Sequence, residues 1–248
     1  MRIDETLCRR LPLAAFVAAR KGRRLGLSAS IAIAIDGPVA SGKTAVGKEV
    51  ARRLGCRFLD TGGTYRAVTL EALRLQLDLD HDSRLTGLAE HIDIELVGGP
   101  DGDRWLVEGV DVTDELRSPE VDRAVSKVSA VSGVRAAVVP QQRRIATQGP
   151  IVMVGRDIGT VVLHDARVKV YLDASPEVRA QRRCLEMEQS GQSPNLERVL
   201  EDLLRRDRID SERDDSPLMP ADDALIIDTD GLGLEQVVAS VIDHAGAA

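Results

Sequence analysis

Aromatic residues are scarce in this chain of 248 residues, which has two Phe, two Tyr and one Trp. The core must therefore be built mainly from Ala, Val, Leu and Ile. So few rings also argue against a protein that stacks single-stranded bases on aromatic side chains. The formal net charge is −7, which argues against a surface that follows a phosphate backbone. A site for an anion would have to be local.

Cysteines are few as well, and long apolar runs are absent. Cys8, Cys56 and Cys184 lie far apart and lack the spacing of metal ligands, which predicts reduced thiols in a cytoplasmic protein. No apolar run approaches the roughly 20 residues that a membrane-spanning helix needs. We expect small-molecule ligands, no membrane or nucleic-acid partner, and a monomer.

The first 30 residues are basic, with seven Arg or Lys against two acids. The apolar residues 11–19 lie between Arg9-Arg10 and Arg20-Lys21, as in a short targeting signal. Basic residues also follow this run, and no good small-residue cleavage site precedes them. We therefore expect residues 1–30 to be a disordered extension, or to result from an upstream start codon. A nucleic-acid-binding tail is the alternative.

A phosphate-binding loop is the most specific motif in the chain. Gly37 to Thr44 fits G-x-x-x-x-G-K-[ST] without a substitution, and it lies between an apolar run and a helical pattern. A loop that leaves a strand and opens a helix directs backbone N–H groups and the helix dipole at one point, where phosphate binds. Lys43 is expected to reach the outer phosphates, and the Thr44 hydroxyl to ligate Mg²⁺. The predicted ATP-binding residues of the loop are Gly37, Pro38, Val39, Ala40, Ser41, Gly42, Lys43, Thr44 and Ala45.

Strand and helix patterns alternate from Ile31 onward, as a parallel sheet requires. Short apolar runs predict strands that are buried on both faces, at residues 31–35, 57–59, 151–154, 168–172 and 225–227. Longer segments predict helices, at residues 43–54, 64–75, 118–146, 176–188, 196–208 and 234–245.

One segment departs from this alternation. Residues 92–97 have a period of two, a Gly-rich stretch follows at 98–103, and residues 104–108 are again strand-like. This pattern predicts a β-hairpin with a six-residue turn, to which residues 110–112 add a third strand. A small antiparallel insert in a parallel-sheet chain predicts a separate lobe.

Polar clusters follow two of the predicted strands. Thr61, Tyr65 and Arg66 follow the second strand, and Arg156 and Asp157 follow the third. Because strand ends form the crevice of an open α/β sheet, we expect these side chains to meet there. A turn with a solvated arginine explains the first cluster equally well, and a salt bridge that ends the strand is the alternative for the second.

A dense mixed-charge run occupies residues 205–215, directly after an amphipathic pattern. Such a run is usually a solvated helix face. Because the charges continue past the expected end of the helix, they favour a lid whose arginines close onto phosphates and exclude water. Arg179, Arg182 and Arg183 on the preceding helix either contact the donor nucleotide or are surface charge.

Together these motifs resemble the bacterial-type cytidylate kinases (CMP/dCMP kinases) of the nucleoside monophosphate kinase superfamily of P-loop NTPases. The resemblance runs from about Ile31 to the C-terminus and rests on IDGPVASGKT, FLDTGGTYR, VEGVDVTDELRSPEV, GRDIGTVV, VYLDASPEVRAQRR, RRDRIDSER and DDALIIDTD. It implies an α/β fold with a parallel five-stranded sheet flanked by helices, a small antiparallel β insert in the monophosphate-binding lobe, and a helical lid. The implied boundaries are 31–61, 150–181 and 216–248 for the core, 62–149 for the lobe and 182–215 for the lid.

The resemblance also implies an activity, the transfer of the ATP γ-phosphoryl group to CMP or dCMP with Mg²⁺. By position, it assigns catalysis to Lys43, Arg156, Arg206 and Arg213, and an ATP contact to Arg182. It assigns the acceptor phosphate to Arg66, Arg156 and Arg213, the cytosine ring to Ser126, Arg135 and Asp157, the sugar to Thr61, Arg206 and Asp210, and a pocket wall to Tyr65. Ala45 stands where relatives commonly carry a hydroxyl residue, which leaves Thr44 as the metal ligand beside nucleotide phosphates and water.

Two alternatives stay open at this stage. The first is a P-loop kinase for another acceptor, such as UMP, AMP or a small metabolite alcohol. The second is a P-loop switch or regulatory binding module, which would hydrolyse nucleoside triphosphate slowly and without an acceptor.

Overall fold

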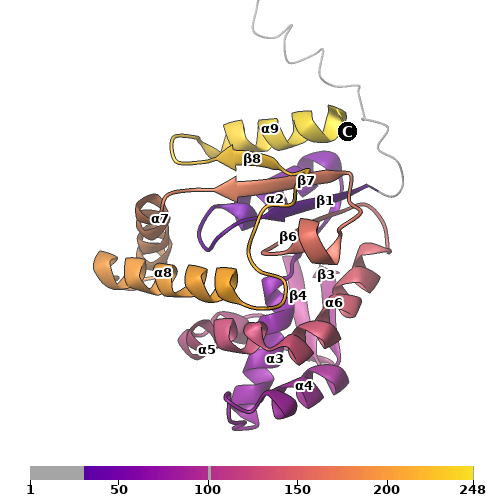
Figure 1. The fold of residues 1–248 in the computed structure, drawn as a ribbon, viewed down its shortest axis with the longest axis vertical. Coiled ribbons are helices and arrows are strands. Elements are labelled where there is room, and N and C mark those ends of the chain that lie inside the picture. The colour runs from indigo at the N-terminus through magenta and orange to yellow at the C-terminus, as the bar shows by residue number, and fades with distance from the viewer. Residues whose placement is uncertain (1–30, 100–101, 248) are drawn as a thin grey trace, which may run out of the picture.

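A five-stranded parallel sheet is the centre of the fold in the computed structural model, which describes residues 31–99 and 102–247 (Figure 1). The strands run in the order β2-β6-β1-β7-β8. In chain order they are β1 (Ala32–Asp36), β2 (Arg57–Asp60), β6 (Ile151–Gly155), β7 (Val168–Asp173) and β8 (Leu225–Asp228). All pairings between neighbours are parallel. The sequence predicted all of these strands, whereas the extension predicted for residues 1–30 lies outside the described residues.

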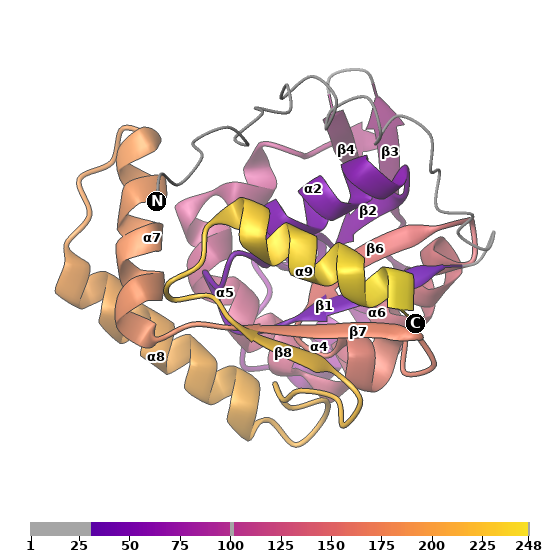
Figure 2. The ribbon, with the colours of Figure 1, turned by 90° about the horizontal axis from the view of Figure 1, so that it is seen from above.

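Helices cover both faces of this sheet. Helices α2 (Lys43–Leu54) and α9 (Leu234–Ala247) cover one face, where α9 crosses the strands in Figure 2 and buries Val237, Val238 and Val241. The second half of α6 (Ser132–Ala146) and a short π-helical turn, η2 (Ile158–Val162), cover the other face. Because both faces are covered, the central strands are continuous apolar runs rather than alternating ones.

A second lobe with its own apolar core lies beside the sheet. It contains α3 (Gly62–Arg74), α4 (Asp82–His91), the 3₁₀ turn η1 (Glu115–Arg117), α5 (Pro119–Ala130), the first half of α6 (Ser132–Ala146), and an antiparallel sheet of β3 (Ile94–Gly99), β4 (Gly102–Val107) and β5 (Val110–Asp111). Trp105 packs against this core and against the core under the main sheet. The predicted β insert and its third strand are thus confirmed.

Helices α7 (Pro176–Gln189) and α8 (Leu196–Glu212) form a hairpin that projects from the sheet (Figure 1). Ser175 and Asn195 cap them, since each side chain accepts a hydrogen bond from a backbone N–H in the first turn. Helix α8 packs against α7 and also against α5 of the second lobe. Among the described residues, no helix combines the length and the apolar character that crossing a membrane would require.

Two sequence predictions about this lobe are wrong. The single helix predicted at residues 118–146 is broken at Val131, which is extended (φ −69°, ψ 117°) so that α5 can pack on α3 while α6 packs on α4. The Ser132-Gly133 dipeptide is the local signal of this break. The turn predicted at residues 98–103 is shorter, because the β3–β4 ladder continues to the pair Gly99 and Gly102.

Three short elements were not predicted. Helix α4 carries Leu85, Leu88 and Ala89 at helical spacing; Leu85 and Ala89 are buried in the second lobe, and Leu88 packs against its core. The turns η1 and η2 depend on contacts that are distant in the sequence, such as the hydrogen bonds from η2 to Asp36. Only α4 therefore had a local pattern that could have indicated it.

The packing of α4 can be tested with Leu85→Ala. Leu85 is fully buried, so its truncation should lower the free energy of unfolding by about 2–5 kcal/mol. Leu75→Ala is the matched control, because Leu75 is 55 % exposed and its loss should cost less than about 0.5 kcal/mol. Urea denaturation measures both, and equal losses in the two variants would contradict the assigned core.

Candidate active site

A cavity of about 790 Å³ lies where the strand ends, the second lobe and the α7–α8 hairpin meet. Most of the residues predicted from the sequence line it: Val39, Ala40, Gly42, Lys43, Thr44, Ala45, Thr61, Tyr65, Arg66, Ser126, Arg135, Arg156, Asp157, Arg206, Asp210 and Arg213. Gly37, Pro38, Ser41 and Arg182 are not among its lining residues. Arg182 instead donates to the Thr229 hydroxyl (3.0 Å) and the Thr229 carbonyl (2.6 Å), beyond the end of β8.

The phosphate-binding loop forms one end of this cavity. Gly37 has φ 148°, and a Cβ there would collide with the carbonyl oxygen of Leu172, so this position requires glycine. Ala40 is left-handed (φ 59°) although it is not glycine, a conformation that costs roughly 1 kcal/mol or more. The Lys43 ammonium donates to the carbonyl of Pro38 at 2.5 Å. The loop thus folds around its own lysine at the start of α2.

Oxygen atoms at this end of the cavity fit a Mg²⁺ ion that arrives with a nucleotide. The Thr44 hydroxyl donates to Asp60 Oδ2 at 2.9 Å, and both residues line the cavity. A hydroxyl and a carboxylate are the hard oxygen donors that Mg²⁺ accepts, usually beside phosphate oxygens and water. Within the described residues, no cluster of three or more His, Cys, Asp or Glu offers an all-protein metal site.

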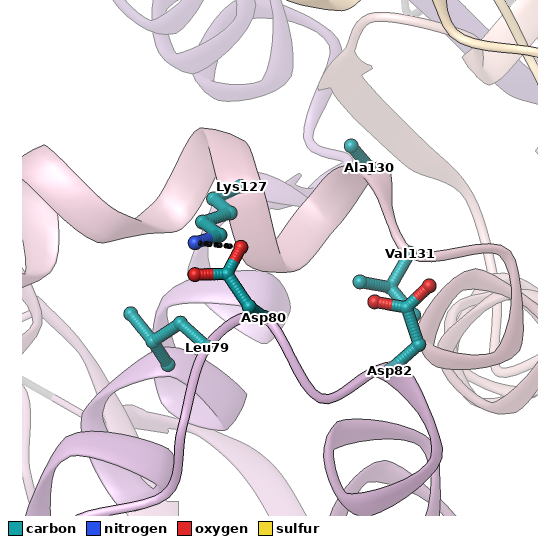
Figure 3. Close-up of a pocket in the computed structure, with 6 residues that line it drawn as sticks. All are labelled: Leu79, Asp80, Asp82, Lys127, Ala130 and Val131. Atoms are coloured by element: carbon teal, nitrogen blue, oxygen red, sulfur yellow. Dashed lines mark ion pairs between the residues drawn. The ribbon is translucent and has the colours of Figure 1, made fainter.

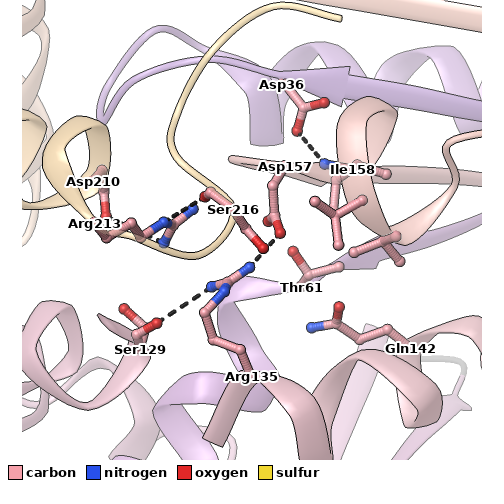
Figure 4. Close-up of polar contacts among 12 residues, drawn as sticks. Asp36, Thr61, Ser129, Arg135, Gln142, Asp157, Ile158, Asp210, Arg213 and Ser216 are labelled. Atoms are coloured by element: carbon pink, nitrogen blue, oxygen red, sulfur yellow. Dashed lines mark hydrogen bonds and ion pairs between the residues drawn. The ribbon is translucent and has the colours of Figure 1, made fainter. Parts of the chain in front are cut away.

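A buried ion pair occupies the middle of the cavity wall. Figure 4 shows Arg135, near the start of α6, between the Asp157 carboxylate and the Ser129 carbonyl, to which it donates at 3.3 Å. The guanidinium also lies over the Tyr65 ring, with 5.2 Å to the ring centroid. Ser126, on α5, lines the same cavity, so the break at Val131 places it and Arg135 on different helices.

Asp36, at the end of β1, fixes the chain beside this ion pair. Its carboxylate accepts hydrogen bonds from the backbone N–H groups of Ile158 (2.8 Å) and Gly159 (2.7 Å), at the start of η2 (Figure 4). Burial raises the pKa of Asp36 from 3.8 to about 6, although the two backbone donors oppose the shift. One carboxylate therefore joins the strand before the phosphate-binding loop to the turn after Asp157.

Three arginines that line the cavity, one on α6 and two on α8 and at its end, carry buried nitrogen atoms without partners. Within the described part of the chain, no hydrogen-bond partner is present for Arg135 Nε, Arg206 Nε or one terminal nitrogen of Arg213. Their neighbour Arg156 donates to Asp210 at 2.9 Å. Buried donors are normally satisfied, so these groups are suited to an anionic ligand.

Positive charge exceeds negative charge in the cavity wall, which contains nine Lys and Arg side chains and five carboxylates. Burial and the nearby Arg156 lower the pKa of Arg206 to about 10 and that of Lys43 well below its usual value. Burial and Arg135 lower the pKa of Arg213 as well. An anionic ligand would relieve this repulsion between cations.

The sequence did not single out several residues of the cavity. Asp122 pairs with Arg66 (2.6 Å) and with Arg183 (3.2 Å), and Trp105 comes from the β insert. Of the three arginines in α7, it is Arg183 that lines the cavity. Arg179 is buried and links the carbonyl of Val39 to α8. No spacing rule in the sequence identifies these contacts, because the partners are distant along the chain.

A second pocket, of about 200 Å³, lies between the α3–α4 connection and α5 (Figure 3). The ion pair between Lys127 and Asp80 crosses it at 2.5 Å. Because its cation is already paired and it has no phosphate-binding loop, this pocket is not a candidate active site.

The fold and the large cavity define a class of protein. A parallel sheet with a phosphate-binding loop at the end of β1 is the architecture of P-loop NTPases, and a second cationic cluster facing that loop is typical of kinases. The family model "Cytidylate kinase" matches residues 33–246. The chain therefore belongs to the cytidylate kinase family.

Curated relatives agree with this assignment. The chain is 47 % identical to a cytidylate kinase of Desulforamulus reducens over 210 residues, 85 % of this chain and 94 % of the relative. It is 45 % identical to one of Bacillus velezensis over 86 % of this chain and 95 % of the relative. It is also 45 % identical to a cytidylate kinase of Rhodococcus opacus, over 87 % of this chain and 94 % of the relative. The resemblance seen in the sequence motifs is confirmed.

The raised pKa of Asp36 predicts a pH-dependent contribution to stability. Because its pKa of about 6 in the fold exceeds 3.8 in the unfolded chain, folding favours the protonated form, and this contribution is lost as the pH rises through 6. The unfolding free energy of the wild type minus that of Asp36→Asn should therefore fall by up to about 3 kcal/mol between pH 4 and pH 7. Urea denaturation across this range tests it, and a constant difference would exclude the titration of Asp36.

Proposed function

We propose that this protein is a (d)CMP kinase, which transfers the γ-phosphoryl group of ATP to CMP or dCMP and yields ADP and CDP or dCDP. The family and the named relatives support the reaction. The observation that carries the assignment is that three arginines with unpartnered buried nitrogens line the same cavity as the phosphate-binding loop. Such an arrangement suits two phosphorylated ligands that face each other.

The acceptor nucleotide would lie against the second lobe. Arg66, Arg156 and Arg213 would hold its phosphate, because all three residues line the cavity. Asp157, Arg135 and Ser126 would bind the cytosine ring, which offers an amino donor together with O2 and N3 acceptors. Thr61, Arg206 and Asp210 would contact the sugar, and the buried Tyr65 would close the pocket.

The chemistry requires no general base, because the attacking atom is an anionic phosphate oxygen. This oxygen forms the new bond to the γ-phosphorus while the bond to the β–γ bridging oxygen breaks, and ADP leaves with that electron pair. Lys43 and the arginines would neutralise the charge of the transferring group and hold the reactants in line. When bound, Mg²⁺ would offset the negative charge of the ATP phosphates, and Thr44 would hold it with Asp60 beside it.

The proposal also assigns each segment of the chain to a core, an acceptor lobe or a lid. Residues 31–61, 150–181 and 216–248 would form the core, 62–149 the acceptor lobe and 182–215 a lid that closes over both nucleotides. The described cysteines, Cys56 and Cys184, are free thiols, which supports a reducing, cytoplasmic setting. The monomeric state stays a prediction.

An acceptor panel tests the activity. With ATP and Mg²⁺, a coupled assay of ADP formation should give the highest kcat/KM with CMP or dCMP. Preference for UMP, AMP or a small alcohol would identify a kinase with another acceptor. Slow ADP formation that no acceptor accelerates would identify a P-loop switch instead.

Lys43→Met should lower kcat about 10²–10³-fold, because it removes a charge that stabilises the transition state. The affinity for CMP should change much less. The matched control is Lys127→Met, since Lys127 pairs with Asp80 outside the cavity. If Lys43→Met kept near-normal turnover in steady-state assays, the assigned site would be wrong.

Thr44→Val should raise the Mg²⁺ concentration for half-maximal activity by about tenfold or more, the scale on which mutations beside a metal change its affinity. The reason is that Thr44 is the proposed hydroxyl ligand of Mg²⁺, and the next residue, Ala45, has no hydroxyl that could replace it. Thr44→Ser keeps the hydroxyl and should need no more Mg²⁺ than the wild type. Titration of activity with Mg²⁺ at fixed ATP tests the pair, and equal requirements in both variants would contradict the ligand assignment.

A further inference from the structure

The Asp122 carboxylate lines the cavity but has no role in the proposed reaction. It lies in the first turn of α5, and one oxygen forms an ion pair with Arg66 of α3 at 2.6 Å. The other oxygen accepts from Arg183 of α7 at 3.2 Å. A single carboxylate therefore joins the second lobe to the α7–α8 hairpin across the mouth of the cavity.

Neither arginine depends on Asp122 alone for its position. The other terminal nitrogen of Arg66 donates to the Leu116 carbonyl at 2.9 Å, and that of Arg183 donates to Glu186 at 3.1 Å. These contacts already orient both guanidinium groups. What Asp122 adds is chiefly a negative charge.

This charge lies within a group of cations. The Asp122 carboxylate raises the pKa of Arg206, whereas burial, Arg156 and Arg66 lower it, with a result of about 10. Asp122 is thus a shared counter-ion for Arg66, Arg183 and Arg206. The phosphate of a nucleoside monophosphate would offer the same cluster a stronger acceptor of guanidinium hydrogen bonds.

We propose that Asp122 is the resident counter-ion of the acceptor-phosphate subsite, and that an incoming phosphate displaces it from Arg66. The carboxylate and the phosphate compete for the same N–H groups, so Asp122 weakens the binding of acceptor and product. This inference rests on the proposed function in one respect, the assignment of the acceptor phosphate to Arg66.

Kinetics of Asp122→Asn test the competition. The variant is isosteric and neutral, so the KM for CMP should fall about three- to tenfold. This range is consistent with the removal of one partly exposed charge of the same sign as the phosphate. The KM for ATP should stay unchanged, and the gain should shrink with added salt. Asp122→Glu keeps the charge and should behave like the wild type.

Glu120→Gln is the matched control. Glu120 lies two residues earlier in the same helix turn and pairs with Arg123 at 3.1 Å, where both side chains are exposed. Its replacement should leave both KM values unchanged. An unchanged or higher KM for CMP in Asp122→Asn would overturn the proposal and assign Asp122 to the positioning of Arg66.

Inorganic phosphate gives a second test that needs neither nucleotide. Phosphate should raise the Tm of Asp122→Asn more than that of the wild type, and adding Arg66→Met should remove the difference. Equal Tm shifts in wild type and Asp122→Asn would contradict displacement at this subsite. The two proposals can fail separately. If neither the wild type nor the variants phosphorylated CMP, but phosphate still raised the Tm of Asp122→Asn more than that of the wild type, the proposed function would be wrong. The role of Asp122 as a counter-ion would still be supported.

Discussion

Repulsion between partly buried cations is the constraint on which the rest of the site depends. Nine basic side chains and five carboxylates line one cavity, and burial together with neighbouring arginines lowers the pKa of Lys43, Arg206 and Arg213. Such a cluster is costly without a ligand, because each charge is removed from water and faces others of its sign. The rest of the fold must therefore offset this destabilisation. The buried apolar residues on the two faces of the parallel sheet do so.

Protein groups anchor several of these arginines. Arg156 pairs with Asp210, Arg135 with Asp157 and the Ser129 carbonyl, and Arg213 donates to the carbonyl of Ser216 at 2.5 Å. Among the described residues, Arg135 and Arg213 each keep a buried nitrogen without a partner. Anchoring through some of its N–H groups fixes the direction of a planar guanidinium and leaves others for a ligand. Donors that are fixed before the ligand arrives need little reorganisation during reaction.

Local physics explains what the sequence predicted well. The central strands of the main sheet are short apolar runs, and all five residues of β6 are buried. The phosphate-binding loop combines residue types that few other structures need. Glycine at position 37 is an example, because its φ and the nearby Leu172 carbonyl leave no room for a Cβ. Five lining residues were likewise indicated by polar clusters at strand ends: Thr61, Tyr65, Arg66, Arg156 and Asp157. Ser126, Arg135, Arg206, Asp210 and Arg213 were assigned only by the family resemblance.

What the sequence missed depends on contacts between distant segments. The break at Val131 follows from the different partners of α5 and α6, and the π-helical turn follows from the hydrogen bonds of Asp36 to a segment more than a hundred residues away. The pairing of Asp122 with Arg183 spans 61 positions. None of these has a periodic pattern, and only the break at Val131 has a local signal, the Ser132-Gly133 dipeptide.

Asp36 and Thr61 explain how two ligand sites can keep a fixed relation. Asp36 immediately precedes the phosphate-binding loop and binds the turn after Asp157, while the Thr61 hydroxyl donates to the carbonyl of Val154 in β6 at 2.9 Å. Both contacts cross between strands at the same edge of the sheet, one on each side of the segment that carries Arg156. In-line transfer tolerates little misplacement of the reacting atoms. In the proposed reaction, the strand ends would hold the loop and Arg156 in a fixed relation. The motion for entry and release would be left to the α7–α8 hairpin and the second lobe, which Asp122 and Arg183 connect.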